Sequence, residues 1–201
     1  MQTTPGTPLT GSASDADKPT SPEAGHGRDW RRRAGHGGDW RRQSPELRLW
    51  CAAVLAVYVL DQLTKWWAER ALSDGEPRDV VDGLVRLHLA HNAGAAFSTG
   101  TSYTVVLTVI ALTVIAVCLR MAGRLRSRGW AVALGLVVGG ALGNVSDRLF
   151  RDPSPFRGHV VDFIEFPHWP IFNVADSAIS VAAVLFVWLA YRGVRIDGTR
   201  G

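Results

Sequence analysis

The chain has 201 residues and a formal net charge of +4, and 20% of its residues are charged. Its mean hydropathy of +0.06 is close to that of a soluble protein, but the polar residues gather in the first 47 positions and long uncharged segments follow. This distribution argues against a soluble helical protein, whose core helices usually keep a polar face.

Residues 1–47 are rich in Pro, Gly, Ser, Thr and charge and contain almost no aliphatic side chains. We expect a disordered, basic cytoplasmic tail. Within it, residues 24–32 recur in nearly the same order as residues 34–42. A Trp-bearing basic arm that binds the anionic inner leaflet is one interpretation. A low-complexity tail without a dedicated role is the one that we favour.

Four later segments fit the length of a membrane-spanning helix, which is about 20 apolar residues. Segments 102–119 and 129–146 contain no charge at all. Segment 49–67 is interrupted by Asp61 and Lys65, and segment 171–191 by Asp176. The sequence therefore predicts an all-α membrane protein with four transmembrane helices. The two cysteines, Cys51 and Cys118, are not spaced as metal ligands and are interpreted as small apolar residues.

Arginine is concentrated in three places: before the first span, between the second and third spans, and after the fourth. Because positively charged loops stay on the cytoplasmic side, these three regions are predicted to be cytoplasmic, including both termini and the C-terminal tail 193–201. The protein would be a multi-pass protein of the inner membrane with its other loops outside.

The first outer loop, about residues 71–101, has a turn-rich start and then alternates apolar and polar residues over positions 85–89. Period-two alternation predicts a strand, so we expect a small extracytoplasmic β-sheet between the first and second helices. In the third span, glycines recur at a spacing of four, which favours close helix packing: Gly135, Gly139 and Gly143.

Polar side chains in or beside the spans all map to the outer side of the predicted membrane. Such groups are costly in a bilayer, so each requires a partner or a role. Their clustering predicts a shared polar pocket at the outer interface, formed by Asp61, Lys65, Asn92, Asn144, Asp147, Arg148, Asp162, Asn173 and Asp176.

Two of these carboxylates have the surroundings of a catalytic pair. Asp162 lies in an apolar run, where desolvation favours its protonated form, and Asp176 lies at a helix start, where the helix dipole favours the ionised form. Two adjacent carboxylates that share one proton provide both an acid and a base. Such a pair titrates as a unit, and the sequence does not assign the two roles.

Structural interpretations remain open for the other polar residues. Asp61 and Lys65 are four residues apart and can form an ion pair within one helix, and Asp147 with Arg148 can order the end of the third helix. Asn144 and Asn173 can cap or bridge helices, or can anchor a peptide backbone. No catalytic part is expected for the histidines near the interface, namely His88, His91, His159 and His168.

Two other function classes also use membrane-embedded acids. A metal-dependent enzyme of lipid synthesis would gather three or more carboxylates on one helix, and this spacing is absent from the sequence. A transporter would place its site at mid-bilayer between internal repeats, and the spans show no repeat.

Five ordered blocks within about residues 48–192 give the sequence a family resemblance. They read DQLTK from position 61, NAGAAF from 92, GGALGNVSDR from 139, VVDF from 160 and FNVADS from 172. In these blocks the chain resembles the bacterial lipoprotein signal peptidases, also called prolipoprotein or type II signal peptidases.

The resemblance implies that residues 48–192 form a four-helix peptidase domain. It would be an aspartic endopeptidase that removes the signal peptide from diacylglyceryl-modified prolipoproteins, cutting just before the lipidated cysteine. It implies a catalytic pair of Asp162 and Asp176, no metal or other cofactor, contact with membrane lipids, inhibition by globomycin-type cyclic peptides and no nucleic-acid partner. The residues implied in substrate binding or in support of the site are Asp61, Lys65, Asn92, Gly94, Asn144, Asp147, Arg148 and Asn173.

The chain departs from the family pattern in two places. The N-terminal tail is not part of the family core, and the stretch between Asp162 and Asp176 is short. The short stretch is expected to alter an outer loop while leaving both motifs intact.

Overall fold

The computed structural model describes residues 45–94, 102–153 and 155–201, and side chains are not described at positions 102 and 103. All described residues belong to one compact unit, Arg42–Gly201. The predicted disordered tail lies almost entirely outside the described residues, except that residues 45–47 are helical.

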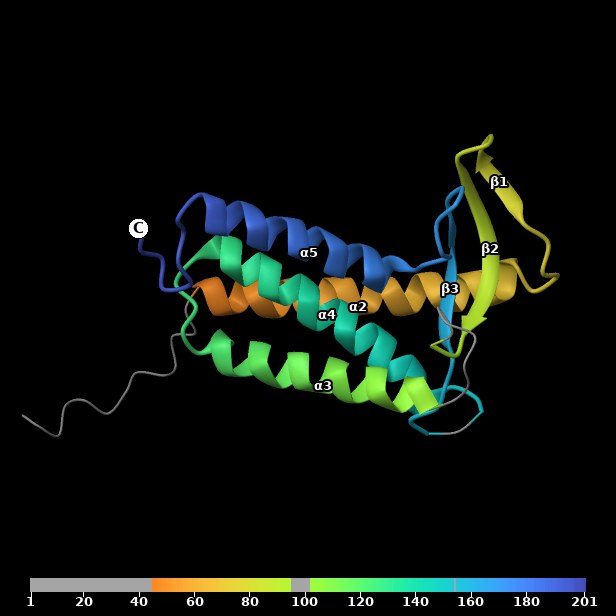
Figure 1. The fold of residues 1–201 in the computed structure, drawn as a ribbon, viewed down its shortest axis with the longest axis horizontal. Helices are drawn as coiled ribbons and strands as arrows, with labels where there is room; N and C mark the ends of the chain where they lie inside the picture. Colours follow the sequence, from red (N-terminus) through yellow and green to blue (C-terminus); the bar gives the residue numbers. More distant parts are fainter. Residues whose placement is uncertain (1–44, 95–101, 154) are drawn as a thin grey trace, which may run out of the picture. The chain divides into compact units, whose positions relative to one another are not determined.

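Four helices in the described part of the chain are long and apolar enough to cross a membrane, as predicted: α2 (Pro45–Ala71), α3 (Ser102–Ala122), α4 (Arg128–Phe150) and α5 (Val174–Tyr191). Helix α4 packs against each of the other three, and the sheet lies at one end of the bundle (Figure 1). The outward faces of α2, α3 and α5 expose Leu and Val side chains, which is the composition that a lipid environment favours.

Glycines on α4 allow α2 to approach closely. A Cβ added at Gly135 would lie 2.7 Å from the Cβ of Ala53, and one added at Gly139 would lie 2.8 Å from the carbonyl oxygen of Val54. These distances are shorter than real Cβ contacts, so a larger residue would push the helices apart. The packing role predicted for the glycines of the third span is confirmed.

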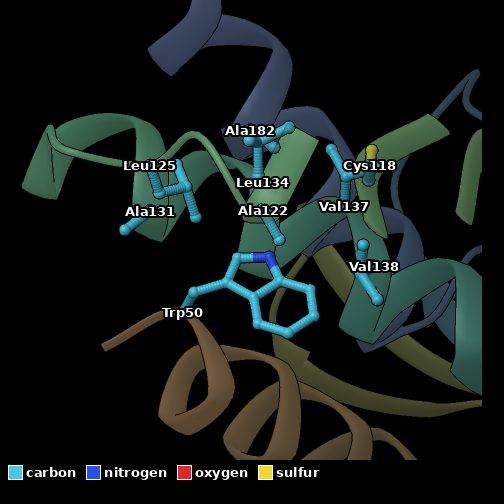
Figure 2. Packing of buried hydrophobic residues seen from close by; sticks show 9 residues of the cluster. All are labelled: Trp50, Cys118, Ala122, Leu125, Ala131, Leu134, Val137, Val138 and Ala182. Carbon is cyan, nitrogen blue, oxygen red and sulfur yellow. The ribbon is translucent and has the colours of Figure 1, made fainter. Parts of the chain in front are cut away.

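The bundle end away from the sheet is held by an apolar cluster with contributions from all four helices. The indole ring of Trp50 on α2 lies among small and branched side chains such as Ala122 on α3 and Leu134 on α4 (Figure 2). Ala182 on α5 is fully buried in the same cluster. The Cys118 side chain also packs here as a buried free thiol, in agreement with its interpretation as a small apolar residue.

The predicted sheet is present and has three antiparallel strands in the order β1 (Arg78–Val81), β2 (Val85–Asn92) and β3 (Val160–Glu165). Two strands come from the segment between α2 and α3, as expected. The third comes from the segment between α4 and α5 and was not predicted, because its apolar run has no period-two alternation. Its first four residues are buried, which explains that run.

Strand β3 leads directly into α5. Residues Ile164 and Phe172 form an antiparallel bridge, with the Phe172 amide donating to the Ile164 carbonyl at 3.0 Å. Helix α5 therefore begins at Val174, three residues later than the predicted start at position 171. The sheet register and this short return together bring β3, the end of α4 and the start of α5 to one place.

Candidate functional site

The first turn of α5 is closed by a reciprocal pair of hydrogen bonds between Asn173 and Asp176. The Asp176 amide donates to Oδ1 of Asn173 at 2.9 Å, and the Asn173 amide donates to Oδ2 of Asp176 at 3.3 Å. This capping box satisfies two backbone donors that a helix start otherwise leaves unpaired. It places the half-buried Asp176 carboxylate at the positive end of the α5 dipole, as the sequence predicted.

Asp162 lies on β3 with only 2% of its surface exposed. Its Oδ2 accepts from Nδ2 of Asn92 at 2.9 Å, and its Oδ1 accepts from Nδ2 of Asn173 at 2.6 Å. The strand register supplies Asn92, because Ala90 on β2 stands opposite Asp162. Asp162 is therefore fixed between the sheet and the start of α5.

Burial raises the pKa of Asp162 to about 6. The hydrogen bonds from Asn92 and Asn173 oppose this rise, and the negative charge of Asp176 adds to it. The expectation that desolvation would favour a proton on Asp162 is confirmed. The pKa of this carboxyl group thus lies well above that of an ordinary Asp, near 6.

Two amide side chains join the two carboxylates. Asn144 on α4 donates from Nδ2 to Oδ1 of Asp176 at 2.8 Å, and its Oδ1 accepts from Asn173 at 3.1 Å. Asn173 in turn contacts Asp162. Asn173 caps α5 and Asn144 bridges α4 to α5, as the sequence suggested. Together they form a continuous hydrogen-bond path from Asp162 to Asp176.

Beneath this path lies a fully buried ammonium group. Nζ of Lys65 is 2.8 Å from Oδ2 of Asp61 and 2.7 Å from Oδ2 of Asp147, and it donates to Oδ1 of Asn144 at 3.0 Å. Three charged side chains here are at most 1% exposed. The predicted ion pair between Asp61 and Lys65 is therefore present, and it is extended by a second carboxylate from α4.

Asp61 also holds the start of α5. Its Oδ1 accepts from the backbone amide of Ala175 at 2.9 Å. A Cβ added at Gly143 would overlap Oδ2 of Asp61, so a larger residue would force this buried carboxylate to move. Gly143 is thus required by the site as well as by helix packing.

Asp147 and Arg148 do not form the pair that the sequence suggested. Asp147 contacts Lys65 and Arg151 instead, with Nε of Arg151 2.7 Å from its Oδ1. Consecutive residues on a helix point in different directions, which separates the two side chains. Arg148 is 9% exposed and acts electrostatically on Asp162 and Asp176.

Sequence reasoning missed Glu69 and Arg151. Nη1 of Arg151 contacts Oε1 of Glu69, so this arginine connects α2 to Asp147 on α4. The signal was available in the spacing, since Glu69 follows Lys65 by four residues and Arg151 follows Asp147 by four. Both lie outside the blocks that carry the family resemblance.

Gly94 occupies a backbone position with φ of +90°, which L side chains rarely adopt. Its amide donates to Oδ1 of Asn92 at 2.8 Å. The turn at Gly94 therefore orients the amide whose other end contacts Asp162.

The remaining sequence candidates lie at the edge of the site. Nδ1 of His88 is 3.3 Å from Oε2 of Glu165, whereas His91 and His159 line a separate pocket of about 460 Å³ beside Arg151. His168 is exposed. Within the described ranges, no group of three or more His, Cys, Asp and Glu side chains is arranged to hold a metal ion.

Comparison with known proteins identifies the family of the chain. Residues 53–192 match the family model described as signal peptidase (SPase) II. A lipoprotein signal peptidase of Streptomyces coelicolor is 47% identical over 148 residues, which are 74% of this chain and 72% of the relative. One from Mycolicibacterium smegmatis is 40% identical over 193 residues, 96% of this chain and 73% of the relative.

Two solved bacterial membrane enzymes share the fold. One aligns with a TM-score of 0.61 at 24% identity and covers 70% of this chain and 91% of its own. The other aligns with a TM-score of 0.58 at 23% identity, over 71% of this chain and 87% of its own. With the family match over most of the chain, these findings show that the chain belongs to the signal peptidase II family of aspartic peptidases.

Proposed function

We propose that this protein removes the signal peptide from diacylglyceryl-modified prolipoproteins, cutting just before the lipidated cysteine, with Asp162 and Asp176 as its catalytic pair. Family membership supports the reaction class. One observation carries the assignment of residues: a buried carboxyl group and a half-buried one at a helix start are joined through Asn173 and Asn144.

In this mechanism the two carboxyl groups share one proton. The ionised member takes a proton from the attacking water, and the protonated member gives its proton to the departing amide nitrogen. The water oxygen bonds to the scissile carbonyl carbon, and the carbon–nitrogen bond then breaks. The pKa of Asp162, raised to about 6, supports a single-proton state up to about pH 6.

Arg148 is suited to hold the substrate backbone. Its Nε is buried and has no hydrogen-bond partner among the residues that the structure describes. A buried unpaired donor is costly, and a carbonyl oxygen of a bound peptide would satisfy it. Together with Asn92 and Asn144, it would fix the scissile bond beside the two carboxylates.

The apolar outer faces of the helices support the proposal that membrane lipids and the acyl chains of the substrate contact the bundle. The exposed aromatic side chains Trp66, Trp67, Phe166 and Trp169 fit a belt at the outer interface. Inhibition by globomycin-type peptides is an expectation from the family resemblance. No partner among nucleic acids is proposed.

The test of this function is cleavage of a diacylated precursor peptide in detergent, with a metal chelator present throughout. We expect kcat/KM to fall on both sides of an optimum, because protonating the base and removing the shared proton each abolish activity. The alkaline limb should lie at or above pH 6, given the raised pKa of Asp162. Activity that vanishes in chelator and returns with Mg²⁺ or Zn²⁺ would replace this mechanism by the metal-dependent alternative.

The arginines that flank the spans support a proposed orientation in the inner membrane with both termini in the cytoplasm and the site at the outer interface. In a chain with Cys51 and Cys118 replaced by serine, new cysteines at Ser14 and Thr199 should react with an impermeant reagent only after the membrane is opened. A cysteine at Asp82, in the turn between β1 and β2, should react in intact spheroplasts. The reverse pattern would place the site on the cytoplasmic side and refute the proposed orientation.

Residues 1–47 and 193–201 are proposed as tails around the peptidase domain 48–192. Deleting residues 1–43 should leave kcat/KM within a few-fold of the full chain, because no site residue and no family block lies there. The amount of inserted protein, measured in the same membranes, is the control. An inserted but inactive truncation would show that the tail has a function.

A further inference from the structure

Arg151 occupies the junction between the membrane helices and the loop that leads to β3. It is the first residue after α4, and its side chain is 24% exposed. Its guanidinium contacts Asp147 through Nε and Glu69 through Nη1. One cation thus connects the outer ends of α2 and α4.

The charges beneath the carboxyl pair do not balance without Arg151. Asp61, Lys65 and Asp147 are buried and sum to one negative charge. Glu69 is 33% exposed, so solvent screens much of its charge. Arg151 is the cation that forms an ion pair with the second buried carboxylate, Asp147, whereas Arg148 interacts with Asp147 electrostatically without forming an ion pair.

Asp147 in turn reaches the catalytic strand. Its Oδ2 accepts from the backbone amide of Val161 at 3.3 Å, next to Asp162, and it also contacts Lys65, which holds Asn144. Arg151 can therefore influence both members of the pair without touching either: Asp162 through β3, and Asp176 through Asn144.

We propose that Arg151 is a positioning residue for the peptidase reaction, whose charge neutralises Asp147 and thereby fixes the protonation and placement of the carboxyl pair. This inference rests on the proposed function. Losing the cation should destabilise the ionised state of the pair and raise the pH at which its shared proton is lost.

The other charged groups around the pair stay the same in this comparison. They include Asp61, Lys65 and Glu69 on α2, Arg148 on α4, and Glu165 with its partners Arg86 and His88 on the sheet. They also include the titratable groups that line the pocket beside Arg151, namely His91, Asp152 and His159. A shift on removing Arg151 therefore reports this one charge.

The test compares two variants that break the same ion pair but change the charge in opposite directions. Arg151→Gln removes the cation, whereas Glu69→Gln removes the anion and leaves Arg151 on Asp147. Arg151→Lys keeps the positive charge but cannot contact Asp147 and Glu69 through two separate guanidinium nitrogens. Arg78→Gln, which breaks an exposed pair with Asp74, is the control for loss of a surface cation.

For Arg151→Gln we expect kcat on the diacylated peptide to fall about tenfold with little change in KM, and the alkaline limb to move up by roughly half to one pH unit. Arg151→Lys should return the limb to its original position. Glu69→Gln should not raise it. Arg78→Gln should match the unmodified protein.

A second readout does not depend on cleavage. The infrared band of a protonated carboxyl group that is lost in Asp162→Asn can be titrated in each folded variant, and Arg151→Gln should move its midpoint upward. If the unmodified protein cuts no peptide, the proposed function fails while this titration still tests Arg151. Equal midpoints in Arg151→Gln and the unmodified protein, or equal shifts in Arg151→Gln and Glu69→Gln, would overturn the role.

Discussion

Replacing either member of the carboxyl pair, as Asp162→Asn or Asp176→Asn, is expected to reduce turnover of a diacylated peptide by roughly 10²–10⁴-fold. Each change removes an ionisable group and nearly preserves its shape. With Asn at 162 or 176 the pair no longer supplies both a proton donor and a proton acceptor. The loss should appear in kcat, measured with substrate at saturation.

The folded state should survive both changes. At Asp162, two amide groups donate to the two carboxylate oxygens, so Asn can accept only one of them and a cost of about 1 kcal/mol is expected. At Asp176, the two oxygens likewise accept from Nδ2 of Asn144 and from the Asn173 amide, so Asn again keeps only one acceptor and a similar cost is expected. Thermal unfolding in detergent, with the exposed Asp82→Asn variant beside it, separates activity from stability. Near-normal turnover by either purified variant would contradict the assignment.

Replacing Lys65 by Met is expected to destabilise the protein by about 3–5 kcal/mol, because Asp61 and Asp147 would lose the cation that they share in the buried interior. The neighbouring helices α2 and α4 meet at this group, so loss of folded protein should accompany loss of activity. Heat unfolding followed by tryptophan fluorescence measures the change.

A surface pair with the same spacing gives a matched comparison. Arg78 and Asp74 are also four residues apart, but both side chains are about half exposed, and Arg78→Gln should leave the unfolding temperature unchanged within error. Adding Asp61→Asn to Lys65→Met should recover part of the lost stability, since Asp147 keeps its ion pair with Arg151, whereas Lys65 is the only ion-pair partner of Asp61 among the described residues. Equal stability of Lys65→Met and the unmodified protein would show that the buried network is dispensable.

The membrane helices and the cluster of polar residues were predicted well from the sequence, because both depend on the free-energy cost of placing polar or charged groups in a bilayer. Long uncharged segments have few alternatives to spanning a bilayer, and a charge within one must find a partner. The environments of Asp162 and Asp176 were also readable, since an apolar run and a helix start act locally.

Features that depend on contacts between residues far apart in the sequence could not be predicted. The strand β3 was hidden because its leading residues, Val160–Phe163, are all buried and show no alternation. The partner of Asp147 was misjudged because adjacency in sequence was taken for adjacency in space, whereas Lys65 and Arg151 reach it. The contact of Asp147 with Lys65 depends on the packing of α2 on α4, whereas its contact with Arg151 spans four residues along the chain and could have been inferred from the spacing.

The ion pair between Asp61 and Lys65, one helical turn apart on the same face of α2, also affects how this helix inserts into the membrane. Helix α2 precedes α4 in the chain, so it emerges from the ribosome before Asp147 and Asn144 exist. Two isolated charges would oppose its insertion, but an ion pair within the helix makes the segment neutral at that stage. When α4 later packs against α2, Lys65 forms its second ion pair, with Asp147. Insertion of α2 therefore does not require α4, although the complete charge network does.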